Sequence, residues 1–239
     1  MLKIEHLTKK YGTHTAVDDL SLHIEKGDIY GFIGHNGAGK TTTMKAVVGI
    51  HDYDEGTILI DGISVKEHSL ECKQMISYIP DNPDLFDYLT GIQYLNFIAD
   101  IYDVSKEQRE QEIKKYADLF EITEALGDLI SSYSHGMKQK LAIVAALIHN
   151  PKLIIMDEPF VGLDPKAALT LKNIMHDLCR NGCAFFFSTH VLDVAEKLCN
   201  KIAIIKEGKL ISSGTMEELV NGQSLEELFM EVVENDTTN

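Results

Sequence analysis

Alternating apolar and polar residues open the chain and give way to short runs that are apolar throughout. The alternation over residues 2–25 predicts strands joined by turns near 11–12 and 17–19. Stretches with helical spacing separate several of the continuous apolar runs that follow. Strands that are buried on both faces show such runs, so we expect a parallel sheet covered by helices.

The same patterns give the expected bounds of individual elements. Strands are predicted at residues 28–33, 57–60, 76–79, 153–156, 184–187 and 202–205. Helices are predicted at residues 39–49, 166–180 and 191–198. Between residues 89 and 148 the apolar residues recur at near-helical spacing, which indicates a helical insertion into an α/β domain.

Composition narrows the class of protein and its partners. Apolar residues make up 44% of the 239 positions and charged residues 25%, as is typical of globular proteins. The formal net charge of −15 argues against a nucleic-acid partner and against adsorption to anionic lipid. No apolar run reaches the roughly 18 residues that cross a bilayer, and residues 1–5 lack the apolar region that a secretory signal would show. We expect a cytoplasmic protein, held by another polypeptide at any membrane it serves.

A glycine-rich loop follows the first predicted apolar strand. Residues 34–41 read Gly-His-Asn-Gly-Ala-Gly-Lys-Thr and match G-x-x-x-x-G-K-[ST] at every fixed position. Lys40 would neutralise the β- and γ-phosphates of a nucleotide, and the Thr41 hydroxyl would ligate Mg²⁺. The alternative is a glycine-rich turn with an incidental lysine. We expect no chemistry from the side chains of His35 and Asn36. The predicted nucleotide-binding positions are Gly34, Asn36, Gly37, Ala38, Gly39, Lys40, Thr41 and Thr42.

Two adjacent carboxylates come directly after the apolar strand predicted at 153–156. Asp157 would lie beside the phosphate loop and hold Mg²⁺, directly or through water. Glu158 would orient and deprotonate the attacking water. A turn with two solvated acids is the alternative, which the phosphate loop elsewhere in the chain disfavours. We therefore expect the fold class α/β, with a P-loop NTPase parallel-sheet core, an N-terminal antiparallel β region and an inserted α-helical subdomain.

A third segment identifies a family resemblance. Residues 133–140 read Tyr-Ser-His-Gly-Met-Lys-Gln-Lys before a predicted helix and resemble the L-S-G-G-Q signature of ATP-binding cassette (ABC) proteins. Ser134 and Gly136 match that signature. Tyr133, His135 and Met137 replace its leucine, first glycine and glutamine.

Other segments follow the order of motifs in this family, so the resemblance covers essentially the whole chain. Tyr11 resembles the aromatic residue that stacks on adenine, although a turn residue is the alternative. Gly-Leu-Asp-Pro at 162–165 resembles the D-loop, in which Asp164 would also cap a helix. Ser-Thr-His at 188–190 resembles the loop of the switch histidine. The resemblance implies that Glu158 and His190 are catalytic and that further nucleotide contacts come from Tyr11, Ser134, Gly136 and Asp164.

One position departs from the family pattern. Glutamine usually begins the loop that leads into the helical insertion, whereas Ile-Pro-Asp-Asn-Pro at 79–83 places Asp81 there. An ionised carboxylate only accepts hydrogen bonds and adds negative charge beside Mg²⁺. We expect Asp81 either to ligate Mg²⁺ together with Thr41 and Asp157, or to alter how a permease signal reaches the site.

The resemblance implies an ATPase that uses ATP and Mg²⁺ and works as a head-to-tail dimer. We expect two identical subunits, and pairing with a paralogue is the alternative. Closing and reopening of the dimer would drive a separate transmembrane ABC permease, so the protein would lie peripherally on the inner face of the cell membrane. The permease would dock near residues 81–90, for which an ordinary interlobe linker is the alternative. No nucleic-acid partner is expected.

The separate ATPase chain, the signature and Asp81 resemble bacterial ABC-2 exporters of peptides, antibiotics or lipids. Importer ATPases, and soluble ABC proteins that act on ribosomes or DNA, are the alternatives. A P-loop enzyme outside this family would leave residues 134–139 and His190 unexplained. The expected domains are a cassette at 1–222, with a core at about 1–88 and 149–222 and a helical subdomain at about 89–148, followed by a C-terminal helix and tail at 223–239.

Overall fold

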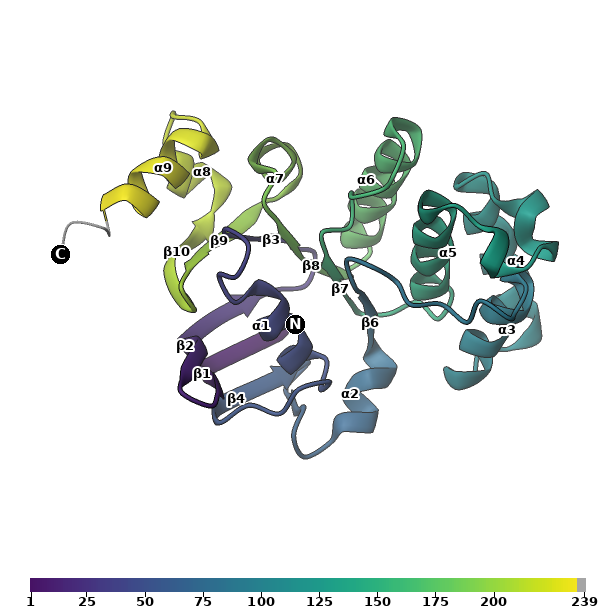
Figure 1. Cartoon of the computed structure of the whole chain (residues 1–239), viewed down its shortest axis with the longest axis horizontal. Helices are drawn as coiled ribbons and strands as arrows, with labels where there is room; N and C mark the ends of the chain where they lie inside the picture. Colours follow the sequence, from purple (N-terminus) through teal and green to yellow (C-terminus); the bar gives the residue numbers. More distant parts are fainter. Residues whose placement is uncertain (236–239) are drawn as a thin grey trace.

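Two β-sheets occupy one side of the molecule and a group of helices occupies the other (Figure 1). The structure is a computed structural model that describes residues 1–235. The strands are β1 (Leu2–Tyr11), β2 (His14–Ile24), β3 (Ile29–Ile33), β4 (Glu55–Ile60), β5 (Ile63–Ser64), β6 (Ile76–Ile79), β7 (Leu153–Asp157), β8 (Ala184–Thr189), β9 (Lys201–Lys206) and β10 (Lys209–Thr215). The α-helices are α1 (Lys40–Val47), α2 (Ser69–Met75), α3 (Gly91–Ile101), α4 (Lys106–Leu119), α5 (His135–Leu147), α6 (Pro165–Arg180), α7 (Leu192–Leu198), α8 (Met216–Val220) and α9 (Leu225–Asn235). Two 3₁₀ helices, η1 (Thr123–Gly127) and η2 (Ile130–Ser132), precede α5.

The larger sheet has the strand order β10-β9-β3-β8-β7-β6, and all neighbours in it are parallel except β10 and β9. Alternate side chains enter two separate cores, as side chains on a strand point to opposite faces. Phe185 and Phe187 pack with residues of α3 to α7 and α9, whereas Phe186 packs with the N-terminal strands, α1 and α2. The predicted parallel sheet, covered on both faces, is confirmed.

The smaller sheet is antiparallel, with the order β2-β1-β4-β5, and confirms the expected N-terminal β region. The turn predicted at Val17-Asp18-Asp19 is wrong, because β2 continues through these residues. The register against β1 shifts there instead, and Asp19 has a left-handed φ of 52°. A bulge accommodates this residue, and the Asp19 N–H donates a hydrogen bond to Thr8 Oγ1 over 3.2 Å.

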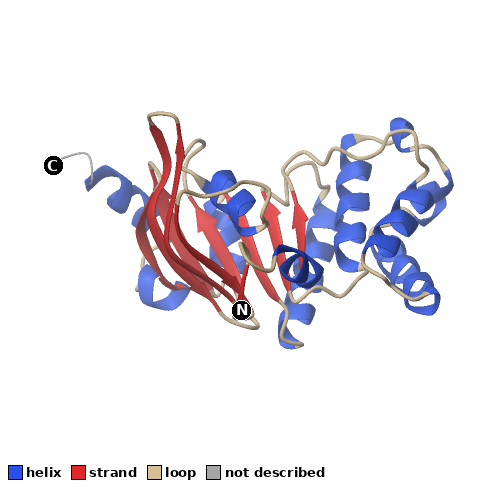
Figure 2. Cartoon of the chain, turned by 90° about the horizontal axis from the view of Figure 1, so that it is seen from below, coloured by secondary structure: helices blue, strands red, loops and turns tan. Residues whose placement is uncertain are grey.

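Helices α3, α4 and α5 form the predicted insertion between β6 and β7, and Figure 2 shows them grouped beyond the edge of the larger sheet. Each begins at a residue whose side chain caps the helix, namely Thr90, Ser105 and Ser134. Within residues 1–235, no helix combines the length and apolar character needed to span a bilayer.

Several elements were not predicted. Helix α2 is short and polar, and β10 contains Ser-Ser-Gly, so neither shows a clear periodicity. The acidic C-terminal helix was expected, but it extends through residues 234 and 235, which were predicted to belong to a frayed tail. The rest of that predicted tail, 236–239, lies outside the described residues.

Candidate functional site

The phosphate loop connects β3 to α1 at the carboxyl end of the parallel strands. Gly37 and Gly39 have φ angles of 84° and 107°, which glycine adopts without strain. A Cβ atom on Gly34 would lie 2.5 Å from the Ile205 carbonyl oxygen, and one on Gly39 would lie 2.5 Å from the Ala16 carbonyl oxygen. The loop therefore packs against the backbones of β9 and β2, and two of its glycines are required by this close approach.

Lys40 begins α1 and its side chain is folded back over the loop. Its ammonium group donates hydrogen bonds to the carbonyl oxygens of Gly34 (2.6 Å) and His35 (3.1 Å). Burial lowers the pKa of Lys40, while the nearby carboxylates of Glu158 and Asp157 act in the opposite direction. The lysine is thus held by the loop at the position where phosphate oxygens would need a positive charge.

Asp157 ends β7 and is almost completely buried, with 2% of its surface exposed. The Thr41 hydroxyl donates a hydrogen bond to Asp157 Oδ2 over 2.5 Å, and the Ser188 hydroxyl donates one to Oδ1. Ser188 lies on β8 directly beside Asp157 in the register of the sheet. Two neighbouring strands and the first turn of α1 therefore fix this carboxylate.

The oxygen atoms of Thr41 and Asp157 suit Mg²⁺, which prefers hard oxygen ligands. Protein groups usually supply only one or two of its ligands, and water molecules or phosphate oxygens supply the rest. Asp81 faces the same cavity from the loop after β6, and its Oδ1 accepts a hydrogen bond from the Asn82 N–H over 2.8 Å. Among residues 1–235, histidine, cysteine and acidic side chains form no cluster of three that could hold a metal by themselves. The site therefore fits a cation that arrives with a phosphate ligand better than one bound by protein alone.

Glu158 directly follows Asp157 and has a left-handed φ of 48°, an unusual conformation for a residue other than glycine. Its N–H donates to Ser188 Oγ over 3.1 Å. Its Oε1 lies 2.8 Å from Nδ1 of His190, the residue after β8. This backbone conformation aims the carboxylate away from the buried Asp157, toward the histidine.

Most of these groups line a cavity of about 500 Å³, whereas Ser188 and His190 are not part of its lining. Residues of the predicted site that line it are Tyr11, Asn36, Gly37, Gly39, Lys40, Thr41, Thr42, Asp81, Asp157 and Glu158. Tyr11 lies at the end of β1 with 45% of its surface exposed. The Lys9 ammonium lies 5.1 Å from the centre of its ring, and the His51 ring meets it edge-on. The exposed ring is free on one face to stack on a base, the role predicted for it from the sequence.

Ser134, Gly136 and Asp164 do not line this cavity. Ser134 caps α5 by accepting a hydrogen bond from the Met137 N–H over 3.3 Å. Asp164 caps α6 by accepting one from the Ala167 N–H over 2.8 Å, and it also pairs with Lys140. The sequence-predicted residues thus fall into two groups, one around the phosphate loop and one at the first turns of α5 and α6.

The second group contains a contact that was not predicted from the sequence. A Cβ on Gly136 would lie 2.9 Å from the Gly162 carbonyl oxygen, and one on Gly162 would lie 2.5 Å from the His135 ring. The start of α5 therefore packs closely on the loop before α6. Ser188 was also missed as a functional residue, although a polar residue at the end of an apolar strand was a signal for it.

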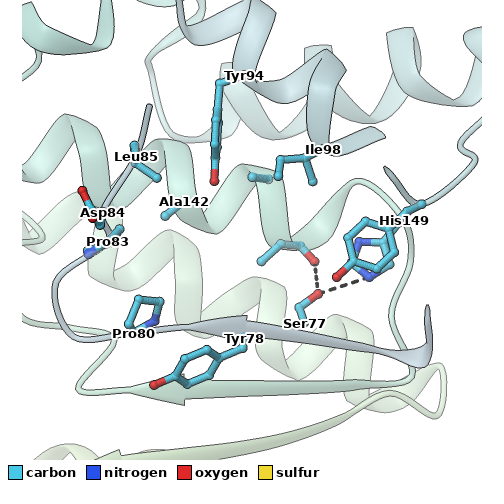
Figure 3. Close-up of a pocket in the computed structure, with 13 residues that line it drawn as sticks. Ser77, Tyr78, Pro80, Pro83, Asp84, Leu85, Tyr94, Ile98, Ala142 and His149 are labelled. Atoms are coloured by element: carbon cyan, nitrogen blue, oxygen red, sulfur yellow. Dashed lines mark hydrogen bonds between the residues drawn. The ribbon is translucent and has the colours of Figure 1, made fainter. Parts of the chain in front are cut away.

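A smaller cavity of about 160 Å³ lies between the sheet and the helical insertion (Figure 3). Tyr78 and Pro80 line it from β6 and the loop after it, and Tyr94 and Ala142 line it from α3 and α5. Next to it, the ring of Phe86 contacts the rings of Tyr88, Tyr94 and Phe97. Tyr88 is 75% exposed, so this aromatic group continues onto the surface.

Known proteins resemble this chain over most of its length. The family model described as "ABC transporter" matches residues 17–161. The chain is 35% identical to the bacitracin transport ATP-binding protein BcrA of Enterococcus faecalis, over 92% of this chain and 70% of that protein. It is 33% identical to the linearmycin resistance ATP-binding protein LnrL of Bacillus subtilis, over 92% of this chain and 70% of that protein.

Solved structures give the same result for the fold. The structure of an ATP-binding subunit of an ABC transporter matches with a TM-score of 0.94 at 32% identity, covering 98% of this chain and 99% of that one. The cassette MJ0796, in a dimeric post-hydrolysis structure bound to ADP and Pi, matches with a TM-score of 0.79 at 24% identity, covering 90% of this chain and 99% of that one. The second likeness supports the fold alone.

Proposed function

Because the chain belongs to the ABC transporter family, as an ATP-binding subunit with ATPase activity, we propose that ATP joins two copies head to tail and that this cycle powers export through a separate membrane permease. The observation that carries the proposal is the separation of the two groups of site residues. Ser134 and Gly136 lie outside the cavity that Lys40 and Glu158 line. A second copy would bring its own α5 to that cavity and complete the site.

Within one copy, the phosphate loop would hold the β- and γ-phosphates through its backbone N–H groups and Lys40. Thr41 and Asp157 would hold Mg²⁺, with Asp81 as a further oxygen ligand. The cation would neutralise charge that develops on the phosphate oxygens. Ser188 would keep the Asp157 carboxylate oriented, since it is the buried hydrogen-bond donor to Oδ1.

Glu158 would act as the general base for the attacking water, and His190 would position both the carboxylate and the γ-phosphate. The contact between Glu158 Oε1 and His190 Nδ1, together with the position of Glu158 in the lining of the nucleotide cavity, supports this assignment. A base must lie within hydrogen-bond reach of the water it deprotonates. When ATP is bound, His190 would hold the Glu158 carboxylate within hydrogen-bond reach of the attacking water.

The partner copy would add Ser134 and the Gly136 N–H at the first turn of α5, where the helix dipole favours an anion. Asp164 would approach the same interface, because the loop before α6 packs on α5. Hydrolysis would remove the γ-phosphate that bridges the two copies, so the dimer would reopen. We propose the core at about 1–88 and 149–222 and the helical subdomain at about 89–148 as the two bodies that move.

The permease would contact the surface near residues 81–90. Exposed aromatic side chains there adjoin the cavity between the sheet and the insertion. A substitution such as Tyr88→Asp would then uncouple ATPase activity from transport while leaving the basal ATPase rate of the isolated subunit unchanged. The location that follows is peripheral, on the cytoplasmic face of the membrane.

Export is supported by relatives named for bacitracin transport and linearmycin resistance. The direction can be tested with inside-out vesicles that contain the subunit and the permease that copurifies with it. Export predicts ATP-dependent accumulation of substrate inside such vesicles. Accumulation only in right-side-out vesicles loaded with ATP would indicate import.

The head-to-tail dimer is tested in a Glu158→Gln background, which should retain ATP because the proposed general base is removed. Size-exclusion chromatography with Mg·ATP should show a dimer that is absent with Mg·ADP. Ser134→Asn and Ser134→Asp form a matched pair, since both side chains can cap α5. Only the aspartate would place a negative charge against the γ-phosphate of the partner site. We expect the Asn variant to dimerise and the Asp variant to remain monomeric, with similar thermal unfolding. Equal dimerisation of the pair, or a wild-type monomer that hydrolyses ATP at full rate, would overturn the proposal.

A further inference from the structure

The C-terminal helix α9 touches two segments of the nucleotide site. It lies beside α7, the helix that follows His190 (Figure 1). The Leu225 N–H donates a hydrogen bond to Glu196 Oε2 of α7 over 3.0 Å. Ser224 caps α9 by accepting a hydrogen bond from the Glu227 N–H over 3.1 Å. The hydrogen bond to Glu196 attaches the first turn of α9 to α7 and so fixes the position of its second turn.

That following turn reaches the phosphate loop through Phe229, which is 6% exposed. The rings of Phe229 and His35 lie 5.1 Å apart at an interplanar angle of 68°, an edge-to-face contact. His35 is an exposed residue in the first half of the loop, and its carbonyl oxygen accepts a hydrogen bond from Lys40. The same carbonyl oxygen accepts a hydrogen bond from the Ala38 N–H over 3.1 Å. The backbone at His35 is therefore linked both to the rest of the loop and to the lysine that must turn toward phosphate.

We propose that Phe229 is a positioning residue for nucleotide binding, which braces the phosphate loop through the ring of His35. The inference rests on the proposed role of this loop, but it does not depend on dimerisation or on the direction of transport. Close backbone approaches hold Gly34 and Gly39 at the two ends of the loop. The intervening residues 35–37 are exposed, and the Phe229 ring is the contact that α9 provides to them.

A phosphate loop that is held in one conformation already directs its backbone N–H groups toward the phosphate position before the nucleotide binds. Less conformational entropy is therefore lost on binding. An edge-to-face aromatic pair is worth enough to change an equilibrium by about two- to tenfold. Loss of the contact should therefore weaken nucleotide binding by such a factor. It should leave turnover at saturating ATP within about twofold, because Phe229 does not line the nucleotide cavity.

Mg·ADP binding to the single chain, measured by isothermal titration calorimetry, tests the inference without involving a dimer. Phe229→Leu removes the ring but keeps an apolar side chain of α9 in the core. His35→Ala removes the other ring, and because His35 is exposed the variant should fold as the wild type does. His35→Phe keeps an aromatic pair and serves as the rescue. Leu228→Val, at the neighbouring buried position of α9, is the control for a general loosening of the helix.

We expect Phe229→Leu and His35→Ala each to raise the dissociation constant for Mg·ADP by about two- to tenfold. The double variant should be no weaker than the single ones, because the two substitutions remove the same contact. His35→Phe and Leu228→Val should bind as the wild type does. Additive effects, unchanged affinity in both single variants, or equal weakening by Leu228→Val would each overturn the inference. If Lys40→Ala binds ADP as well as the wild type, the proposed role of the loop fails as well.

Discussion

The Nδ1 atom of His190 lies 2.8 Å from Oε1 of Glu158, and this contact joins the residues that follow two neighbouring parallel strands. Both residues leave their strands at the same edge of the sheet, β7 before Glu158 and β8 before His190. The glutamate is the more enclosed partner, with 15% of its side chain exposed against 52% for the histidine. The histidine can therefore move toward a ligand while the base stays in place.

This relationship predicts a selective effect of His190→Ala. The ATPase turnover number should fall by about 10- to 100-fold, because the base and the γ-phosphate lose a positioning group. Mg·ADP affinity should stay within about twofold, since ADP lacks the γ-phosphate. Steady-state kinetics and calorimetry on the same preparation measure both quantities. His176→Ala, at an exposed position on α6, is the control. A normal turnover number in His190→Ala would show that the contact is incidental.

The position of Asp81 predicts that its replacement changes the Mg²⁺ dependence of the ATPase activity. Replacing it by the usual glutamine of the family removes a negative charge from the cavity that also contains Thr41 and Asp157. The Mg²⁺ concentration for half-maximal ATPase activity should rise by about three- to tenfold, because an amide oxygen attracts the cation less strongly than a carboxylate. ATPase assays over a Mg²⁺ titration at fixed ATP give this value.

Asp84→Asn is the matched control for Asp81→Gln, since Asp84 faces the neighbouring cavity between the lobes and not the nucleotide cavity. The control should leave the Mg²⁺ dependence as it is in the wild type. An unchanged Mg²⁺ requirement in Asp81→Gln would exclude a ligand role. It would leave the alternative, in which Asp81 transmits the state of the permease.

The sequence was informative where local chemistry requires a particular residue at a particular place. The glycines of the phosphate loop, the strand before it and the acidic pair could be predicted because backbone conformation and charge restrict those positions. The fold class followed from strands that are apolar on both faces, as in Phe185-Phe186-Phe187, which feed two cores.

Other features depend on contacts between segments far apart in the chain. The bulge at Asp19 follows from pairing with β1, and an isolated Val-Asp-Asp stretch reads as a turn. The role of Ser188 follows from its register beside Asp157. The ring contact between His35 and Phe229 spans nearly the whole chain, so no local pattern indicated it. Sequence periodicity reports which face of an element is buried, but not which partner buries it.

Two glycines provide a test of the contact between α5 and the loop before α6. Gly162 and Gly182 have similar left-handed φ angles of 81° and 89°. A Cβ on Gly162 would displace the His135 ring, whereas one on Gly182 would meet no atom within 4 Å. Alanine at either position should cost about 1–2 kcal/mol of unfolding free energy from backbone strain. The exposed His135 ring can move aside, so the two costs should be similar in chemical denaturation.

The two substitutions should differ in function. Displacing His135 at the first turn of α5 should weaken ATP-dependent dimerisation of Gly162→Ala, measured by size exclusion in the Glu158→Gln background. Gly182→Ala lies in the turn after α6 and should dimerise normally. Equal dimerisation of the two variants would mean that the packing of His135 on Gly162 is structural only.

His149 predicts a pH dependence of stability. Its ring stacks on Tyr102 at a centroid distance of 3.6 Å, and its Nε2 lies 3.2 Å from the Ile76 carbonyl oxygen and 3.4 Å from Ser77 Oγ (Figure 3). Burial lowers the pKa of His149 from 6.5 to about 4, since the charged ring would lose its hydration. The folded protein therefore keeps this ring neutral at pH values where the unfolded chain binds a proton.

Stability should accordingly decrease as the pH falls from about 6.5 toward 4, because protons bind preferentially to the unfolded state over that interval. The contribution of this one group amounts to as much as about 3 kcal/mol of unfolding free energy at the acid end. His149→Phe keeps the stacked ring and removes the titration, so its unfolding free energy should fall less steeply over the same interval. His176→Gln, at an exposed position, should follow the wild-type curve. Urea denaturation at pH steps across the interval measures all three proteins, and parallel curves for His149→Phe and the wild type would show that His149 is not the group responsible.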